Sequence, residues 1–596
     1  MDTNRLKRFA QDARRELRNF VAARLPLVLA ENSAARRERP QTVAELEKAR
    51  KSKSDEALVD KIAYTWFNRF CALRFMDVMG YNPIRIVSPL PGHFQPEILE
   101  EAKGGNIDET FVAESKIRER IKGLLAGSIS AVDGQGEAYK LLLVSACNAY
   151  NKVMPFLFQK IDDYTELLLP DDLMKENSIL MKTREAITED VAADGVEVIG
   201  WLYQFYISEK KDEVMGKTVK TEDIPAATQL FTPDWIVRYL VQNSLGRLWM
   251  LNHPNSKLAE EMEYYIPPTE ADKDFLEVKS PEDLKICDPC CGSGHMLTYA
   301  FDLLVKIYEE EGYDRRKIPT LILLKNLHGV EIDTRARELA AFALTMKARE
   351  YDSRFLRREN APYPQICVLQ NITFDEGDIP QYMDAIGHDL FTESLQQTLH
   401  QFTQADCFGS LIAPKINDAA ATMDVLTERG VEAELFLANV HNKVLDVINQ
   451  ADFLSQKYHV VVTNPPYMGG KGMNADLKRF AERLYPDSKS DLFAMFIERC
   501  LQLVQHQGTI GMITMQSWMF LSSFEKLRTK LLDENTILSM AHLGARGFDS
   551  IGGEVVQTTA FTMTNTLIPD YKGAFIRLVD GNNEAEKAAM FREAVR

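Results

Sequence analysis

The chain has 596 residues, of which 45% are hydrophobic and 26% are charged, and its formal net charge at pH 7 is −17. This length and composition are typical of a globular protein with several domains. The negative charge argues against a protein that holds nucleic acid through bulk charge alone. It leaves open a local basic groove, or a partner that supplies the contacts.

The eight cysteines are scattered along the chain, which favours reduced thiols over a disulfide framework. Cys287, Cys290 and Cys291 lie inside a longer motif, and no second pair follows at zinc-finger spacing, so we expect no metal site. The N-terminus is charged and no run of about eighteen apolar residues appears, so we expect a cytoplasmic protein that does not bind membranes.

Residues 1–215 show helical periodicity and are predicted to form an all-α domain. Aromatic residues recur at helical spacing in 62–76 and 196–206, which indicates a buried core rather than a platform for stacking bases. Two interpretations of the arginine-rich start stay open: a solvated helix face, or a face that contacts phosphates or a partner. The arginines include Arg14, Arg15, Arg18, Arg36, Arg37 and Arg39. The charged stretch 210–223 is predicted to be a linker.

The next segment contains a helix start and a glycine-rich loop. Thr232 is a plausible N-cap, and Pro233 suits the first helical position after it. A strand near 284–287 then leads into a loop and an amphipathic helix that runs through residue 307. The loop contains Asp288, Pro289, Gly292, Ser293 and Gly294. Its glycines allow the backbone to approach a ligand, and Asp288 is placed to accept a hydrogen bond from a ligand ammonium, directly or through water.

Two further strands are predicted at 326–331 and 365–369. The first ends in Glu331, which is placed to bind ribose hydroxyls while Ile332 packs on an adenine ring. The second ends beside Asn371. A mostly helical insertion at about 380–455 follows, and its length suggests a functional or interaction surface without indicating which.

The β-branched run 459–463 is predicted to be a short buried strand that ends in Asn464-Pro465-Pro466-Tyr467. The Asn464 side-chain oxygen and the Pro465 carbonyl could each accept one N–H of a nucleobase amine, which would free the nitrogen lone pair for attack. Proline holds its acceptor rigidly and adds no competing donor, and Tyr467 could stack on the base. A simple turn after a core strand is the alternative.

The last part of the chain contains a flexible loop at 469–472, where one lysine suggests a lid or a phosphate contact. A capped helix opens at Asp491, and strands are predicted at 508–514 and 555–564. A loop at 516–520 follows the first of these strands, and a loop at 542–548 precedes the second. The segment 584–596 reads as an unfinished helix.

Asn-Pro-Pro-Tyr resembles the catalytic motif of amino-methyltransferases that use S-adenosylmethionine. The order of the motifs, from the Thr-Pro helix to the late aromatic loop, resembles DNA adenine-N6 enzymes whose recognition domain comes last. Three segments make the chain similar to one family in particular, the BREX adenine-specific methyltransferases (PglX), which belong to a bacterial system that marks self DNA and restricts phage. These segments are Trp66–Arg69, Gly200–Gln204 and Phe408–Leu411. The resemblance covers nearly all of 1–575.

The resemblance implies an α/β fold: a Rossmann-like, S-adenosylmethionine-dependent methyltransferase sheet at 216–575, with the helical insertion at about 380–455. The all-α domain at 1–215 precedes this sheet. Residues 576–596 would begin a C-terminal region that we expect to be truncated, because related proteins continue into a recognition domain. The DNA sequence that is recognised therefore cannot be read from this chain.

The resemblance also implies roles for individual residues. The catalytic residues would be Asn464, Pro465, Pro466 and Tyr467, with Tyr467 and Phe548 stacking on the base. S-adenosylmethionine would be bound by Phe231, Thr232, Pro233, Asp288, Pro289, Gly292, Ser293, Gly294, Glu331, Ile332 and Asn371. Related enzymes often have Asp where Asn371 stands, so that match is weaker.

The implied activity is site-specific methylation of adenine N6 in double-stranded DNA, on a base flipped out of the duplex. The implied partners are DNA and other subunits of a phage-defence system, and no metal is implied. Three alternatives stay open. They are a type I or type IIG restriction-modification methyltransferase, a protein-glutamine or RNA amino-methyltransferase, and a cofactor-binding scaffold that is active only with partner subunits.

Overall fold

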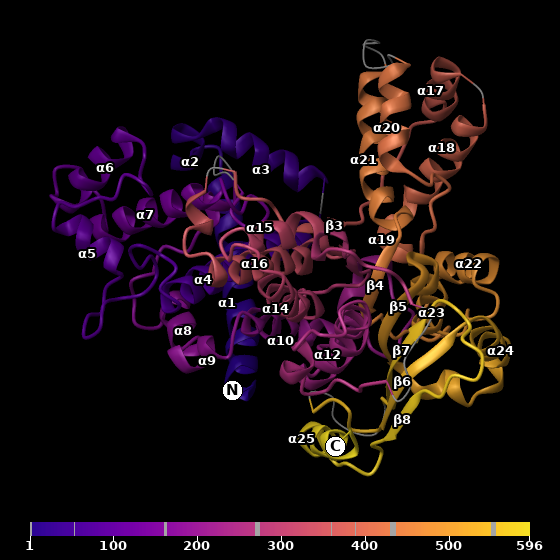
Figure 1. The fold of residues 1–596 in the computed structure, drawn as a ribbon. Helices are drawn as coiled ribbons and strands as arrows, with labels where there is room; N and C mark the ends of the chain where they lie inside the picture. The colour runs from indigo at the N-terminus through magenta and orange to yellow at the C-terminus, as the bar shows by residue number, and fades with distance from the viewer. Residues whose placement is uncertain are drawn as a thin grey trace. The chain divides into compact units, whose positions relative to one another are not determined.

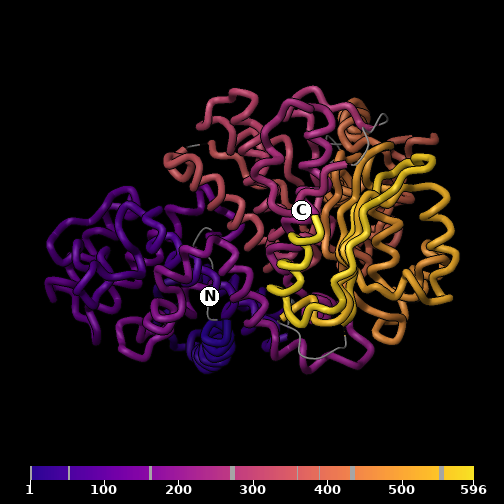
Figure 2. The backbone as a smooth tube through the Cα atoms, turned by 60° about the horizontal axis from the view of Figure 1, so that its bottom comes forward, coloured from indigo at the N-terminus to yellow at the C-terminus, as the bar shows by residue number. Residues whose placement is uncertain are grey.

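The protein is described from a computed structural model, drawn as a ribbon in Figure 1 and as a backbone tube in Figure 2. The structure describes residues 3–52, 54–159, 164–268, 275–358, 360–387, 389–429, 437–549 and 556–595. The chain forms two compact units, residues 1–209 with 345–363 and residues 210–344 with 364–596. The chain therefore enters the first unit twice.

The described part of the first unit is helical, which confirms the predicted helical character of the N-terminal region. Its long helices are α1 (Thr3–Leu29), α4 (Asp55–Val78), α7 (Gly134–Tyr150) and α10 (Glu197–Val214). The shorter ones are α2 (Ala34–Glu38), α3 (Pro40–Ser52), α5 (Glu97–Lys103), α6 (Ser115–Leu125), α8 (Ile179–Ala186) and α9 (Glu189–Ala193). Because α10 runs to Val214, the predicted linker at 210–223 is wrong in its first residues.

Helix α4 supplies much of the first unit's core. Ser54 caps its N-terminus by accepting a hydrogen bond from the Ala57 amide at 3.2 Å. The helix is apolar on nearly every side, so it is buried rather than amphipathic. Its Phe67 ring lies 4.7 Å from the ring of Tyr206 on α10. The aromatic residues of 62–76 and 196–206 thus include core contacts, as predicted.

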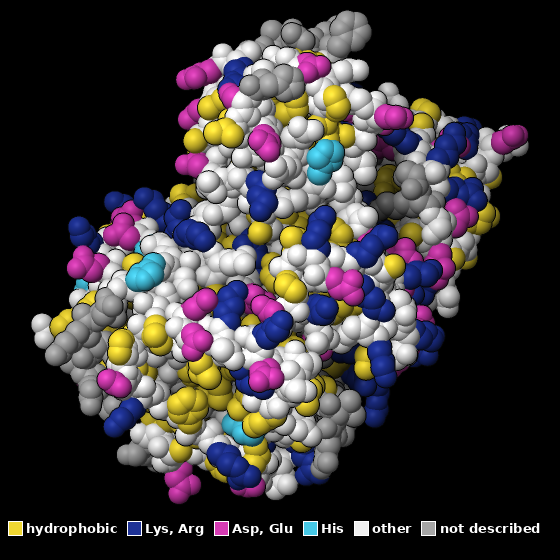
Figure 3. Space-filling view, turned by 90° about the vertical axis from the view of Figure 1, so that its right-hand side faces the viewer, with side chains coloured by type: hydrophobic (Ala, Val, Ile, Leu, Met, Phe, Trp, Pro, Cys, Tyr) yellow, Lys and Arg dark blue, Asp and Glu magenta, His cyan; other side chains and the backbone are white. Residues whose placement is uncertain are grey.

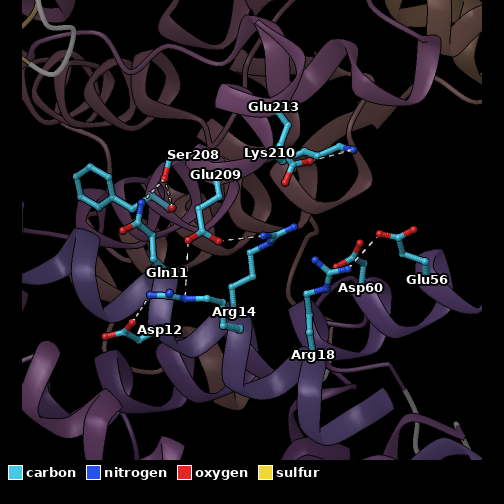
Figure 4. Close-up of polar contacts among 12 residues, drawn as sticks. Gln11, Asp12, Arg14, Arg18, Glu56, Asp60, Ser208, Glu209, Lys210 and Glu213 are labelled. Atoms are coloured by element: carbon cyan, nitrogen blue, oxygen red, sulfur yellow. Dashed lines mark hydrogen bonds and ion pairs between the residues drawn. The ribbon is translucent and has the colours of Figure 1, made fainter. Parts of the chain in front are cut away.

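Arg14, Arg15 and Arg18 of α1 are paired with carboxylates of the same unit, as Figure 4 shows for Arg14 and Arg18. The contacts are Arg14–Glu209 at 3.2 Å, Arg15–Asp12 at 2.5 Å, Arg18–Asp60 at 2.8 Å and Arg18–Glu56 at 3.3 Å. Arg36 and Arg39 pair with Glu47 and Glu166 at 2.6 and 2.7 Å. These pairings favour the ion-paired helix face over a phosphate-binding face.

The second unit contains an eight-stranded sheet with the order β3-β2-β1-β4-β5-β7-β6-β8. Its strands are β1 (Ile286–Asp288), β2 (Leu327–Glu331), β3 (Gln365–Val368), β4 (Tyr458–Thr463), β5 (Val504–Met515), β6 (Thr536–Gly544), β7 (Thr558–Thr564) and β8 (Ala574–Arg577). Strand β7 is antiparallel to both of its neighbours, and the other pairings are parallel. The predicted α/β class is confirmed. The first residue of the strand predicted at 555–564 lies outside the described residues.

The strand order reverses between β1 and β4, as in doubly wound sheets. Strands β1, β2, β4 and β5 are parallel, so their carboxyl ends lie along one edge of the sheet. In such sheets ligands bind outside the carboxyl ends, at the point where the order reverses. This topology brings together the polar residues that follow β1, β2 and β4 in sequence.

Figure 1 also shows the helices of the second unit that lie outside the insertion. They are α11 (Ile224–Thr228), α12 (Asp234–Val241), α13 (Arg247–Asn252), α14 (His295–Glu310), α15 (Ile318–Leu321), α16 (Thr334–Tyr351), α22 (Ala475–Leu484), α23 (Leu492–Leu503), α24 (Glu525–Glu534) and α25 (Glu584–Val595). The residues of α16 from Thr345 onward belong to the first unit. Phe591 of α25 packs within 6 Å of the rings of Trp235, Tyr239 and Tyr264. The helix predicted at 584–596 is therefore a packed part of this unit.

The insertion is helical, as predicted. Its helices are α17 (Asp378–Ile386), α18 (Leu390–Gln401), α19 (Ala405–Phe408), α20 (Ala419–Glu428) and α21 (Ala438–Ser455). Their apolar side chains share one core with Val330 of β2 and with Leu369, so the insertion is anchored to the sheet.

Figure 3 shows Lys and Arg side chains mixed with Asp and Glu over one face of the molecule. None of the described helices is long and apolar enough to cross a membrane.

Candidate active site

A pocket lies at the edge of the sheet where the strand order reverses. Its lining residues come from five separate stretches of the chain and from α23. They are Ile224, Pro225, Thr228, Gln229, Leu230, Pro289, Cys290, Gly292, Glu331, Ile332, Cys407, Phe408, Gly409, Ser410, Leu411, Asn464, Pro466, Leu492 and Phe496. Six residues predicted from the sequence thus share one pocket: Pro289, Gly292, Glu331, Ile332, Asn464 and Pro466.

The Asn464 amide is held in one orientation. Its Nδ2 donates to the Leu230 carbonyl at 3.2 Å and to the Thr232 hydroxyl at 3.1 Å. A carbonyl oxygen can only accept, so the amide nitrogen must face Leu230. The Oδ1 atom is buried and has no hydrogen-bond partner within the described structure. A buried acceptor left in this state costs about 1–3 kcal/mol, which a ligand N–H would recover.

Thr232 does not cap a helix, so that prediction is wrong. Helix α12 begins at Asp234, Pro233 occupies the cap position, and no side chain caps the helix. The Thr232 hydroxyl accepts the Asn464 amide instead. Phe231 lies beside it, with its ring 4.3 Å from the ring of His295. This segment therefore orients Asn464 rather than only starting a helix.

Two carboxyl groups lie at the ends of β1 and β2. Burial raises the pKa of Asp288 to about 7, and the nearby Glu331 carboxylate adds to this. Burial likewise raises the pKa of Glu331 to about 7, and Asp333 adds to this. Glu331 accepts hydrogen bonds from the backbone N–H groups of Gly292, Ile332 and Asp333 at 2.8–2.9 Å. The charges that raise both pKa values are other carboxylates, so the site favours a cationic ligand.

The glycine-rich loop between β1 and α14 requires its glycines. Gly292 and Gly294 have φ values of +53° and +87°, a region that side chains disfavour. A Cβ atom on Gly294 would lie 3.1 Å from the Cα of Ala340, so this loop packs directly against α16. Helix α14 begins immediately afterwards, at His295, and directs its N-terminus toward the loop.

The Tyr467 ring is fixed on two sides. Its hydroxyl donates to the Ile513 carbonyl at 3.0 Å, and its ring meets that of Phe493 edge-on at 6.2 Å. The next residue, Met468, donates its backbone N–H to Asp491 at 2.9 Å. Asp491 also caps α23, as predicted, and burial raises its pKa to about 6. The turn after Asn464 is therefore tied to both β5 and α23.

Asn371 and Phe548 lie outside the lining of this pocket, as do Phe231, Thr232, Pro233, Asp288, Ser293, Gly294, Pro465 and Tyr467. Asn371 is exposed, and its Oδ1 accepts the backbone N–H of Asp406 at 3.0 Å. Phe548 is buried, with 3% of its surface exposed, in the loop that follows β6. The adenine contact of Asn371 and the base stacking of Phe548 stay predictions.

Sequence reasoning missed the contribution of the insertion to the pocket. The Ser410 hydroxyl donates to the Pro289 carbonyl at 2.5 Å, which ties the insertion to the glycine-rich loop. Arg499 donates to the Ser410 carbonyl at 2.9 Å. Gly409 has a φ of +55° and breaks the helical pattern next to Phe408. The sequence did single out Phe408–Leu411 as a segment of the family resemblance, but it gave no sign that this segment lines the pocket.

Sequence comparisons place relatives along nearly the whole chain. Residues 325–548 match the family described as Eco57I restriction-modification methylase. The chain is 42% identical to the adenine-specific methyltransferase BrxX of Escherichia coli O9:H4 (strain HS), over 98% of this chain and 52% of that protein. It is 37% identical to the adenine-specific methyltransferase PglX of Lacticaseibacillus casei (strain Zhang), over 90% of this chain and 46% of that protein. The chain spans about half the length of these relatives.

Solved structures match the chain more weakly. A DrdV–DNA complex matches with a TM-score of 0.42 and 13% identity, over 89% of this chain and 44% of that chain. The restriction-modification enzyme LlaBIII bound to DNA matches with a TM-score of 0.39 and 14% identity, over 91% and 32%. The sequence relatives confirm the predicted resemblance to the BREX adenine-specific methyltransferases (PglX).

Proposed function

We propose that this chain carries the methyltransferase activity of a PglX-type protein, which transfers a methyl group from S-adenosylmethionine to N6 of adenine in DNA. One observation carries the proposal: the Asn464 oxygen is buried and unpartnered while its amide hydrogens are both engaged. The names of the curated relatives, adenine-specific methyltransferases, support adenine as the substrate.

The chemistry requires two acceptors at one amine. The N6 amine of adenine is a poor nucleophile because its lone pair is delocalised into the ring. Asn464 Oδ1 and the Pro465 carbonyl would each accept one N–H, which draws the nitrogen toward tetrahedral geometry and localises the lone pair. Acceptors that are already oriented act without reorganising during the reaction. The Leu230 and Thr232 contacts supply that orientation.

The target base must leave the duplex to reach this pocket. Tyr467 would then stack on the base, because Ile513 and Phe493 already hold its hydroxyl and its ring in place. No nucleophilic side chain is needed in this scheme. Holding the amine in line with the methyl donor would supply most of the rate.

Residues at the ends of β1 and β2 fit the cofactor. S-adenosylmethionine supplies a methyl group on a sulfonium, and it also carries an ammonium. The acidic pair Asp288 and Glu331 suits such a cation, with Glu331 also placed for the ribose hydroxyls. The backbone of Gly292–Gly294 and residues 231–233 would complete the site. The two positive-φ glycines leave the backbone open to close approach.

A labelled cofactor tests the activity. Labelled S-adenosylmethionine would be offered with duplex DNA, with RNA or with protein, and we expect label at adenine in DNA. Asn464→Ala should reduce transfer about 1,000-fold while cofactor affinity stays within about three-fold. Unchanged methylation by this variant would overturn the assignment. Label in protein glutamine or in RNA would favour the other amino-methyltransferases.

The cellular role is proposed on the same basis. In cells that carry the whole phage-defence system, sequencing for N6-methyladenine should find a methylated motif with intact Asn464 and none with Asn464→Ala. We expect phage resistance to depend on the other subunits as well. Methylation that appears only when partner subunits are added would favour the scaffold alternative. Cleavage of unmethylated DNA by the protein itself would favour a type IIG enzyme.

A further inference from the structure

The loop after β5 exposes two large apolar side chains. Phe520 is 60% exposed and Leu521 is 52% exposed, next to each other in the chain. The residue two positions before Phe520, Trp518, is by contrast buried at 4% exposure. The loop thus divides its apolar residues between an anchor that faces the core and a tip that faces solvent. Nothing in the catalytic scheme above uses this tip.

The tip lies at the same edge of the sheet as Asn464. Strand β4 ends at Thr463, which pairs with Met512 of β5. Strand β5 continues in the same direction to Met515, about 10 Å farther along the strand. Tyr467 already contacts Ile513 of this strand. The loop that follows β5 therefore begins at the same edge of the sheet as Asn464, one strand away from it.

Hydrogen bonds hold the loop after β5 in place. The Trp518 indole N–H donates to the Thr514 hydroxyl at 3.1 Å, and Arg528 of α24 donates to the carbonyls of Trp518 and Leu521 at 2.8 and 2.6 Å. The His542 ring lies 6.0 Å from the ring of Phe520. A loop held at both ends of its tip presents Phe520 and Leu521 in a fixed place.

We propose that Phe520 and Leu521 form a wedge that enters duplex DNA at the target base pair and fills the space left by the flipped adenine. This inference rests on the proposed methylation of DNA, and it assigns the step that brings the base to Asn464. Apolar side chains inserted between base steps unstack them, and extrusion of a base requires that unstacking. Their place at the carboxyl end of β5, the strand next to the one that ends before Asn464, favours the DNA stack over a protein partner as the occupant.

The test uses the intact protein and compares two DNA duplexes. The methylated motif would first be mapped in cells by sequencing. One duplex then carries the target adenine paired with thymine, and the other carries it opposite an abasic site, where little pairing has to be broken. The double variant Phe520→Ala/Leu521→Ala should methylate the paired duplex about 10- to 100-fold more slowly than the unmodified protein. On the duplex with the abasic site, the rates should agree within about three-fold.

Phe575→Ala provides the matched control. Phe575 is a phenylalanine of nearly the same exposure, 62%, but it lies on strand β8. Its replacement should leave transfer to both duplexes unchanged. If Phe575→Ala slowed transfer to the paired duplex as much as the double variant does, the loss would reflect exposed apolar area rather than the position of the loop. That result would overturn the wedge.

The remaining outcomes separate the wedge from the activity itself. No transfer to either duplex by the unmodified protein would overturn the proposed function and the wedge with it. Normal transfer to the paired duplex by the double variant would overturn the wedge alone. An equal loss on both duplexes would indicate a structural or docking role instead. Loss of binding to a partner subunit, with normal transfer to the paired duplex, would assign the tip to that partner.

Discussion

Asp77 in the helical unit and Asp288 in the sheet unit are each 2% exposed, yet their surroundings differ. Asp77 accepts hydrogen bonds from the Asn82 side chain and from the backbone N–H groups of Ile86, Val87 and Ser88. Asp288 accepts one backbone hydrogen bond, from Cys290 at 3.1 Å, and the Thr463 hydroxyl is the other group that lowers its pKa. The two carboxylates are equally buried, but Asp77 has more hydrogen-bond donors around it than Asp288.

The difference in donors separates a structural carboxylate from one suited to bind a ligand. Burial raises the pKa of both groups. At Asp77 four donors oppose that shift and fasten the 82–88 loop around the carboxylate. At Asp288 the pKa reaches about 7, with the Glu331 carboxylate adding to the effect of burial. An anion at Asp288 is thus unfavourable in the free protein, and a bound cation would stabilise it.

Removal of the structural carboxylate should have the largest effect on stability. Asp77→Ala leaves four buried donors without an acceptor, so we expect the free energy of unfolding to fall by about 3–5 kcal/mol. Chemical denaturation of the variant and of the unmodified protein measures this. Asp77→Asn keeps one acceptor and should fall between the two. If Asp77→Ala unfolds at the same denaturant concentration as the unmodified protein, the hydrogen bonds to Asp77 do not stabilise the 82–88 loop.

Asp288→Asn should have the opposite profile. We expect S-adenosylmethionine to bind about 100-fold more weakly, because the amide removes a charge that faces the ligand. At pH 8 the free energy of unfolding should rise by about 1–2 kcal/mol, because the unfavourable anion is gone. Calorimetry measures both quantities. A variant that loses stability and keeps its affinity would show that Asp288 is structural, like Asp77.

Cofactor affinity should depend on pH near neutrality. The ligand needs the carboxylate forms of Asp288 and Glu331, whose pKa values lie at about 7. At pH 6 each group is about nine-tenths protonated, so the affinity should fall about ten-fold or more between pH 8 and pH 6. The stability of the free protein should change in the opposite direction. Because the pKa values of Asp288 and Glu331 are raised in the folded state, their contribution to the free energy of unfolding falls as the pH rises from about 4 to about 7. Titration of S-adenosylmethionine into the protein at several pH values measures the first trend, and a flat profile would contradict it.

Ser410→Ala should produce the smallest change. The substitution removes the hydrogen bond to the Pro289 carbonyl, which is worth about 1 kcal/mol. We expect cofactor affinity to fall about three- to five-fold with no change in the overall fold. The comparison with Ser517→Ala, a partly exposed serine of the loop after β5, controls for the loss of a hydroxyl. Equal affinities in the two variants would mean that the insertion does not support the cofactor loop.

The sheet and three strand-end residues could be predicted from the sequence because their signals are local. Buried runs that end in Asp288, Glu331 and Asn464 indicate parallel strands, and parallel strands present their carboxyl ends at one edge. The pocket contribution of Ser410 could not be predicted, because it depends on how a long insertion folds back. Thr232 was misassigned for a related reason: its type fits a cap, but its partner is 232 residues away in the chain.

Strand β6 and the linker show two further limits of local patterns. Strand β6 (Thr536–Gly544) was not predicted, although it is central to the second half of the sheet. Its last three residues, 542–544, belong to the segment 542–548 that was predicted to be a loop. The stretch 210–223 is highly charged, and charge alone suggested a linker. Yet Val219 is buried and its N–H donates to the Gly472 carbonyl at 2.8 Å.

Arg499 has a consequence for how this protein could vary among its relatives. Its buried guanidinium donates to the carbonyls of Ile412 and Leu454 at 2.8 and 2.6 Å, as well as to Ser410. The segment 413–453 therefore starts and finishes at a single side chain. Changes to those residues of the segment that do not pack in the core with Val330 and Leu369 should leave both of its ends at Arg499, and with them the pocket wall at Ser410.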